Sequence, residues 1–269
     1  MRHLFITRGI PGSGKSTFLQ SAGLGPYTLS PDTLRLAYSS PVMNDVGRIV
    51  MPYQDDRRVW QQLHELLDMR MARGELIVVD ATHTTSSYFQ QYAQLAQKYR
   101  YKLYVIDFAD VPLRVCLERN RQRAPHKVVD DVVLEKMHAR LSTCVIPKQY
   151  TVIQPADVKE LIASYQQPIN LSQYEHIHHI GDIQGCYTPL REYFEQHPYT
   201  EHDYYIFTGD LLDRGTENAE VLQYVCDNFV DKPNVTFIEG NHDGYIWQWL
   251  THQPIRAREF NGRTRAQLE

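Results

Sequence analysis

Short apolar runs alternate with amphipathic stretches along the first half of the chain. In residues 53–73, for example, the apolar positions from Val59 to Leu67 fall at helical spacing, and Gly74 ends the stretch. The alternation predicts an α/β fold with a parallel sheet covered by helices on both faces. The predicted strands cover residues 4–7, 27–29, 76–79 and 102–108, and the predicted helices cover residues 14–21, 53–73, 86–99, 112–123 and 130–141.

The same pattern restarts after residues 147–168, a stretch that contains three prolines and one short helical segment near 157–164. We therefore predict two domains, residues 1–165 and residues 171–269. In the second, predicted strands cover residues 176–180, 204–208 and 235–238, and predicted helices cover residues 188–196, 217–229 and 244 onward. Each of these strands runs into a turn that contains glycine and aspartate.

The composition is that of a globular protein, with 42% apolar and 22% charged residues. No apolar run approaches the roughly 18 residues needed to span a bilayer, and the first seven residues are too short an apolar stretch for a signal peptide. The cysteines lie far apart without a C-x-x-C pair, at Cys116, Cys144, Cys186 and Cys226. This usage favours a reducing, cytoplasmic location with no membrane partner over a disulfide framework or a zinc knuckle.

The net charge of −4 conceals a difference between the two halves. Residues 1–150 carry 20 Lys and Arg against 14 Asp and Glu, a net +6, whereas residues 151–269 carry 8 against 18, a net −10. A basic half suits a polyanionic ligand and an acidic half suits metal ions, although ordinary variation of charge along a chain explains the same numbers.

Residues 9–17 match the phosphate-binding pattern G-x-x-x-x-G-K-[ST], between a predicted strand and a predicted helix. Backbone N–H groups of such a turn, and the helix N-terminus behind it, surround phosphate oxygens. Lys15 reaches the β- and γ-phosphates, and the hydroxyl of Ser16 holds Mg²⁺. The pattern predicts a site for ATP or another nucleoside triphosphate, formed by Gly9, Gly12, Ser13, Gly14, Lys15, Ser16 and Thr17.

Three further features of the first half suggest phosphoryl transfer. Asp32 follows the second predicted strand, where it can take a proton from an acceptor hydroxyl, and Arg35 can hold an acceptor phosphate; helix capping is the alternative role of Asp32. Asp80 ends the most apolar strand and is a Walker-B-type carboxylate that can position metal, water or acceptor. The stretch with Arg119, Arg121 and Arg123 can close over the transferring phosphoryl group, or form a solvated basic face.

Residues 1 to about 165 resemble the kinase domain of 5′-hydroxyl polynucleotide kinases, the end-healing enzymes of phages and bacteria. The resemblance rests on residues 9–17, on Ser-Pro-Asp-Thr-Leu-Arg at 30–35 and on Glu-Arg-Asn-Arg-Gln-Arg at 118–123. It implies that Asp32 is the general base, that Arg35 contacts the acceptor phosphate and that Arg123 stabilises the transferring phosphoryl group. His83 stands where relatives often have Asn.

In the second half, each of three predicted strands is followed by a short motif with metal-binding side chains. The motifs are Gly-Asp-Ile-Gln-Gly at 181–185, Gly-Asp-Leu-Leu-Asp-Arg-Gly at 209–215 and Gly-Asn-His-Asp at 240–243. Oxygens arriving at successive strand ends can share two metal ions. We expect Asp182, Asp210 and Asn241 to be ligands, with Asp210 bridging. His242 can protonate the leaving oxygen, and Arg214 can bind the substrate phosphate.

Residues 175–243 resemble the calcineurin-like metallophosphoesterases, especially the diadenosine-tetraphosphatase-like branch and the phosphatase of bacterial kinase–phosphatase end-healing proteins. The resemblance implies a pair of Mn²⁺-like ions. Gln184 replaces the His of the usual D-x-H motif and can still offer an amide oxygen. The family takes further His ligands from downstream motifs, and only 26 residues follow Asp243. We therefore expect an incomplete phosphatase half with little or no phosphatase activity.

The combined motifs predict a nucleic-acid end-healing enzyme that phosphorylates a 5′-hydroxyl of RNA or DNA and removes 2′- or 3′-phosphates. Two alternatives stay open. One is a small-molecule kinase fused to a dinucleotide polyphosphatase, and the other is a non-catalytic, nucleotide-gated regulatory ATPase.

Overall fold

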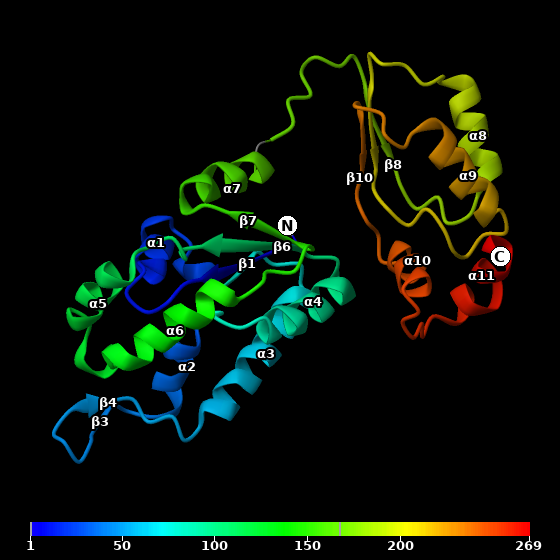
Figure 1. Cartoon of the computed structure of the whole chain (residues 1–269). Helices are drawn as coiled ribbons and strands as arrows, with labels where there is room; N and C mark the ends of the chain where they lie inside the picture. Colours follow the sequence, from blue (N-terminus) through cyan, green and yellow to red (C-terminus); the bar gives the residue numbers. More distant parts are fainter. Residues whose placement is uncertain (1, 167) are drawn as a thin grey trace. The chain divides into compact units, whose positions relative to one another are not determined.

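The computed structural model describes residues 2–166 and 168–269 and divides into two compact units, Met1–Gln167 and Pro168–Glu269 (Figure 1). We call them unit 1 and unit 2. Each contains its own parallel sheet and its own apolar core. Among the described residues, no helix is both long and apolar enough to span a membrane.

Unit 1 is built on a five-stranded parallel sheet with the strand order β2-β5-β1-β6-β7. The central strand β1 is buried along its whole length, because both of its faces are covered. Leu4 and Ile6 point into one core cluster, and Phe5 between them points into another. The strands are β1 (His3–Arg8), β2 (Thr28–Leu29), β5 (Ile77–Val79), β6 (Lys102–Asp107) and β7 (Tyr150–Ile153).

Helices cover both faces of this sheet (Figure 1). Leu63 of α3 and Phe89 of α4 belong to the first cluster, whereas Leu19 of α1 and Val158 of α7 belong to the second. The predicted α/β architecture is therefore confirmed. The helices are α1 (Lys15–Ser21), α2 (Pro31–Tyr38), α3 (Asp56–Ala72), α4 (Ser87–Tyr99), α5 (Leu113–Arg121), α6 (Asp131–Thr143) and α7 (Val158–Gln166), with 3-10 turns η1 (Gly25–Tyr27), η2 (Pro125–Lys127) and η3 (Pro155–Asp157).

One helix, one hairpin and one strand of unit 1 lie outside the predicted helix and strand ranges. Helix α2 begins with a proline in its first turn and directly follows a strand of two residues. The hydrophobic pattern that could predict either element is therefore short. The antiparallel hairpin of β3 (Val42–Met43) and β4 (Ile49–Val50) has only two residues in each strand. Strand β7 lies at the edge of the sheet with two of its four residues exposed, which removes the continuous apolar run of a buried strand.

Unit 2 contains a three-stranded parallel sheet with the order β10-β9-β8. Phe207 of β9 and Val221 and Val225 of α9 lie in its core cluster. The strands are β8 (Ile177–Ile180), β9 (Tyr204–Phe207) and β10 (Val235–Phe237), and the helices are α8 (Tyr187–Gln196), α9 (Asn218–Asn228), α10 (Asp243–Leu250) and α11 (Arg265–Leu268), the last preceded by a π-helical turn η4 (Phe260–Thr264). The three predicted strands and the first three helices are confirmed.

Candidate active sites

The turn between β1 and α1 is packed so closely that two of its glycines have no room for a side chain. Gly12 has a φ of +84°, and a Cβ atom there would overlap the carbonyl group of Cys116 in α5. At Gly9, a Cβ would lie 2.9 Å from the Cβ of Phe108. Gly14 has a φ of +99° and stands at the N-cap of α1. The glycines therefore allow the close approach of backbone that a phosphate-binding turn requires.

Lys15 is nearly buried beneath this turn, with 7% of its surface exposed. Its ammonium donates a 3.0 Å hydrogen bond to the carbonyl oxygen of Ile10. Burial lowers the pKa of Lys15 to about 8, against the opposing effect of the Asp80 carboxylate. The charges of Arg123 and Asp32 also act on this ammonium, so both residues lie within electrostatic reach of Lys15.

Ser16 and Asp80 are joined directly. The Ser16 hydroxyl donates a 2.6 Å hydrogen bond to Oδ2 of Asp80, and the Thr7 hydroxyl donates to Oδ1 at 3.1 Å. A hydroxyl and a carboxylate oxygen side by side are the hard donors that Mg²⁺ takes, together with phosphate oxygens and water. These two residues therefore fit a nucleotide-bound Mg²⁺, which when bound neutralises phosphate charge.

Asp32 and Arg35 lie on the first turns of α2, just after β2. The Arg35 guanidinium donates a 2.6 Å hydrogen bond to Asp32 and two more, at 2.8 and 2.6 Å, to Oδ1 of Asp56 on α3. It also lies 5.1 Å from the ring centroid of Tyr53. The N-cap of α2 is Ser30, so the capping role considered for Asp32 is wrong. Asp56 was missed by sequence reasoning because an acidic residue in a helix's first turn is common.

The three arginines around the end of α5 have different surroundings. Arg119 lies next to the phosphate-binding turn, because a Cβ on Gly14 would stand 3.6 Å from its Nη1. Arg121 forms a 2.6 Å ion pair with Asp131 on α6. Arg123 donates to the carbonyl oxygen of Lys127. Arg119 is thus a second candidate for contact with a bound phosphate, beside the predicted Arg123.

His83 is a buried part of the framework. Its ring nitrogens lie 2.6 Å from the Thr7 carbonyl oxygen and 2.9 Å from the Tyr92 hydroxyl, and burial lowers its pKa to about 4. A neutral, 1% exposed imidazole with both nitrogens engaged cannot act on a substrate.

In unit 2, the loops that follow β8 and β9 carry a cluster of left-handed residues. Asp182, Gln184, Asp210, Asp213 and Arg214 all have φ between +49° and +82°. Such conformations cost non-glycine residues of order 1 kcal/mol each and gather at functional sites. These two loops contact each other at a glycine: a Cβ on Gly215 would overlap the carbonyl oxygens of Gln184 and Gly185.

Asp243 joins the second and third motif loops. Its carboxylate accepts hydrogen bonds from the backbone N–H groups of Asp210, Leu211 and Gly240 at 2.8 to 3.0 Å. In the opposite direction, the N–H of His242 donates to Oδ1 of Asp210 at 2.9 Å. The two predicted ligand loops are therefore fixed to each other by hydrogen bonds from backbone N–H groups to the carboxylates of Asp210 and Asp243.

His242 is oriented by a buried carboxylate. Its Nδ1 lies 2.9 Å from Oδ2 of Asp213, and the Thr264 hydroxyl donates to Oδ1 at 2.6 Å. Burial raises the pKa of Asp213, but the hydrogen bonds from Thr264 and His242 outweigh it and the pKa is lowered. The other ring nitrogen, Nε2, lies 3.5 Å from Nη2 of Arg214. Asp213 was not among the predicted site residues.

The predicted metal ligands offer oxygen donors at the strand ends. Nε2 of Gln184 donates to the Asp182 carboxylate at 3.3 Å, and Arg214 donates to the Gln184 amide oxygen at 3.5 Å. Asp210 follows β9, and Asn241 stands in the loop after β10. Two carboxylates and two amides offer hard oxygen donors, which suit hard divalent ions better than soft thiolates do. This set of ligands contains no imidazole.

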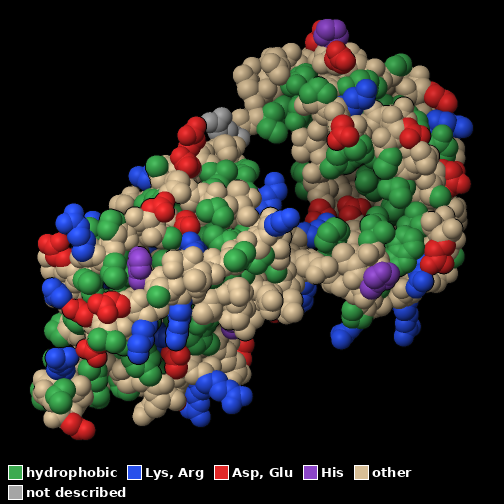
Figure 2. Space-filling view, in the orientation of Figure 1, with side chains coloured by type: hydrophobic (Ala, Val, Ile, Leu, Met, Phe, Trp, Pro, Cys, Tyr) green, Lys and Arg blue, Asp and Glu red, His purple; other side chains and the backbone are tan. Residues whose placement is uncertain are grey.

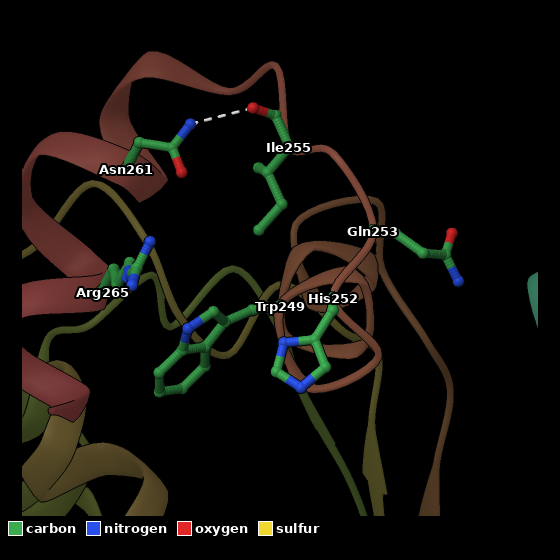
Figure 3. Close-up of a pocket in the computed structure, with 6 residues that line it drawn as sticks. All are labelled: Trp249, His252, Gln253, Ile255, Asn261 and Arg265. Atoms are coloured by element: carbon green, nitrogen blue, oxygen red, sulfur yellow. Dashed lines mark hydrogen bonds between the residues drawn. The ribbon is translucent and has the colours of Figure 1, made fainter.

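A hollow of about 330 Å³ lies between α10 and α11 of unit 2 (Figure 3). Figure 3 shows Trp249, Ile255 and Arg265 facing it, whereas the Gln253 side chain points away. Thr264, the neighbour of Arg265, donates a hydrogen bond to Asp213. This wall of the hollow is therefore next to the residues that orient His242.

Comparison with known families agrees with this geometry. Residues 4–144 match the AAA domain family, and residues 175–266 match the calcineurin-like phosphoesterase family. The chain belongs to the AAA domain family. It combines a P-loop kinase-type domain with a calcineurin-like phosphoesterase segment, and these families imply the use of nucleotide and divalent metal.

Two similar curated proteins are bis(5′-nucleosyl)-tetraphosphatases. A symmetrical bis(5′-nucleosyl)-tetraphosphatase of Marinomonas sp. is 45% identical over 107 residues, which covers 28% of this chain and 37% of the relative. The asymmetrical bis(5′-nucleosyl)-tetraphosphatase PrpE of Bacillus subtilis is 30% identical over 99 residues, which covers 34% of this chain and 40% of the relative. The chain thus spans less than half the length of either.

Among solved structures, a chain of the Pnkp1/Rnl/Hen1 RNA repair complex aligns with 96% of this chain and 88% of its own length. The sequence identity is 14% and the TM-score is 0.43.

Proposed function

We propose that unit 1 transfers the γ-phosphate of a nucleoside triphosphate to the 5′-hydroxyl end of a nucleic acid. The observation that carries this proposal is the Asp32–Arg35 pair. A carboxylate and a guanidinium joined at 2.6 Å lie beyond the end of β2, and the Asp32 charge acts on the ammonium of Lys15 beneath the phosphate-binding turn. A base and an anion-binding group are thus available on the acceptor side.

In this mechanism each side chain has a separate task. Lys15 binds the β- and γ-phosphates, and Ser16 and Asp80 hold the Mg²⁺ that accompanies them. Asp32 takes the proton of the attacking hydroxyl, and Arg35 binds a phosphate of the acceptor strand. Arg123, with Arg119 beside Gly14, stabilises charge on the phosphoryl group in transit.

The charge of the first half supports a polyanionic acceptor. Residues 1–150 have a net charge of +6. On the face drawn in Figure 2, Lys and Arg are interspersed with Asp and Glu over unit 1, so the excess does not form one continuous patch there. This surface suits binding of a short nucleic-acid end by a few side chains better than binding of a long nucleic acid along a continuous basic surface.

For unit 2 we propose a site for phosphoester hydrolysis, with 2′- and 3′-phosphate ends as the substrate, whose four proposed ligands lack imidazole and therefore give this chain little activity. Asp182, Gln184, Asp210 and Asn241 hold divalent ions, which when bound supply an activated water. Arg214 binds the substrate phosphate. His242, held by Asp213, gives a proton to the leaving oxygen. Joining the two activities suits a broken strand whose ends carry both lesions.

A second candidate for unit 2 is hydrolysis of dinucleoside polyphosphates. The similarity to the two bis(5′-nucleosyl)-tetraphosphatases favours it. Unit 1 would then phosphorylate a small molecule.

An acceptor panel separates these functions. The 269-residue chain is incubated with γ-labelled ATP, Mg²⁺ and, in turn, 5′-hydroxyl RNA, 5′-hydroxyl DNA, mononucleosides and sugars. Label on an oligonucleotide, absent when its 5′ end is already phosphorylated, supports end healing. Label on sugars or nucleosides alone contradicts it, and ATP hydrolysis without any labelled acceptor favours the regulatory ATPase.

A further inference from the structure

A second cluster of metal-ligating side chains lies in the sheet of unit 2 at the ends where the strands begin, opposite the ends that carry the motifs. Glu175 and His176 directly precede β8, and Asp203 directly precedes β9. The metallophosphoesterase motifs follow the other ends of the same strands. Four strand residues at about 3.3 Å each place roughly 13 Å between the two edges. This cluster is therefore separate from the site that contains Asp182 and Asp210.

Asp203 is the centre of the cluster. It is 8% exposed, and its Oδ1 lies 3.0 Å from Nδ1 of His176. The backbone N–H of Glu175 donates a 2.8 Å hydrogen bond to the carbonyl oxygen of His202, which fixes the position of Glu175. One ligand atom from each of Glu175, His176 and Asp203 lies within 4.8 Å of the others.

We propose that Glu175, His176 and Asp203 bind a divalent transition-metal ion, with Zn²⁺ as the best-fitting ion. Ligands bonded at about 2.0–2.1 Å in a tetrahedral site stand about 3.3 Å apart, close to the 3.0 Å between His176 and Asp203. One imidazole and two carboxylates suit Zn²⁺ and similar ions, and water completes the coordination. The ion joins the start of β8 to the start of β9.

A supporting shell holds the Asp203 carboxylate in place. Its second oxygen lies 3.3 Å from Nε2 of His178, and Nδ1 of His178 lies 2.7 Å from the Tyr193 hydroxyl on α8. The His178 ring stacks on Tyr205 with ring centroids 4.7 Å apart. Such a chain of hydrogen bonds, which orients a ligating carboxylate from behind, is typical of protein metal sites. An isolated surface ion pair needs none of it.

The test is a metal titration of the full chain after removal of bound metal. Zn²⁺ binding is measured by isothermal titration calorimetry, and Co²⁺ is added as a spectroscopic probe of tetrahedral coordination. Asp182→Asn is used as the background, because it weakens the strand-end site and leaves this cluster intact. We expect one equivalent of Zn²⁺ to remain bound in that background and a tetrahedral Co²⁺ absorption band to appear.

His176→Asn is the decisive variant, because the His176 side chain is 72% exposed and its replacement spares the core. We expect it to weaken this equivalent by roughly 100-fold or more and to remove the Co²⁺ band. His179→Asn, at an exposed histidine of β8 three residues further along, is the matched control and should bind as its parent does. Unchanged Zn²⁺ affinity in both His176→Asn and Glu175→Gln, or no Zn²⁺ bound in the Asp182→Asn background, would overturn the proposal.

Discussion

Nη1 of Arg35 lies 2.6 Å from Oδ1 of Asp32, one helical turn apart on α2. The same guanidinium donates a hydrogen bond to Asp56. The Arg35 side chain is 13% exposed, whereas the Asp32 side chain is 56% exposed. Arg35 is thus fixed from the α3 side, while the Asp32 carboxylate is open to solvent. This arrangement leaves the carboxylate accessible to an acceptor hydroxyl.

Replacing Asp32 with Asn should lower kcat for phosphoryl transfer by roughly 10²–10⁴-fold, because the amide cannot take the proton of the hydroxyl. The affinity for Mg-ATP should stay near that of the wild type, since Asp32 lies outside the phosphate-binding turn. Steady-state transfer and ATP titration calorimetry measure the two effects. A loss of ATP affinity with unchanged turnover of the bound nucleotide would show that Asp32 is not the base.

Arg35 and Arg123 should affect different kinetic constants. Arg35→Ala should raise the acceptor KM, because a ground-state contact with an acceptor phosphate is lost. Arg123→Ala should lower kcat, because its charge meets charge that develops in the transition state. Arg121→Ala is the matched control, since Arg121 is paired with Asp131 on the surface. Equal changes in acceptor KM alone for both variants would exclude the role proposed for Arg123.

Nucleotide binding should take up protons near pH 8. Burial lowers the pKa of Lys15 to about 8, so part of the free protein carries a neutral amine at that pH. Bound polyphosphate favours the charged form, and binding at pH 8 should therefore take up about 0.5 proton, falling toward zero near pH 6.5. Titration calorimetry in buffers of different ionisation enthalpy measures the uptake. Proton release at pH 8, or an uptake that does not change with pH, would contradict this account of Lys15.

Phosphatase activity of this chain should be close to background in the presence of Mn²⁺. The four proposed ligands of unit 2 are two carboxylates and two amides, and neutral imidazoles are the usual additional donors for such ion pairs. A generic phosphodiester and a 3′-phosphate oligonucleotide are suitable substrates. Turnover that disappears in Asp210→Ala would show that the donors of this chain suffice.

Most of the fold was predictable because its signals are local. The phosphate-binding turn combines three glycines with a strand before it and a helix after it, and the buried run ending at Val79 has the length and composition of a central strand. Strand β7 was not predictable in this way, because it is an edge strand with exposed residues. Its place beside β6 depends on pairing across more than 40 positions.

The partners of the predicted site residues were harder to find than the residues themselves. Asp56 reaches Arg35 across 21 positions, and Asp213 reaches His242 across 29. Asp56 stands in no pattern that separates it from an ordinary surface acid. Asp213 stands within the motif at 209–215, but only the fold shows that it is buried beside His242. The cluster around Asp203 was missed for a related reason, since its ligands come from the starts of two strands and form no motif.

The most direct test of the central proposal is transfer of label from γ-labelled ATP to a 5′-hydroxyl oligonucleotide, with wild-type protein and Asp32→Asn compared at equal occupancy by ATP. We predict labelling of the 5′ end by the wild-type protein and a rate lower by roughly 10²-fold or more in the variant. Absence of label on RNA and DNA ends, with efficient label transfer to a small hydroxyl compound instead, would contradict the account.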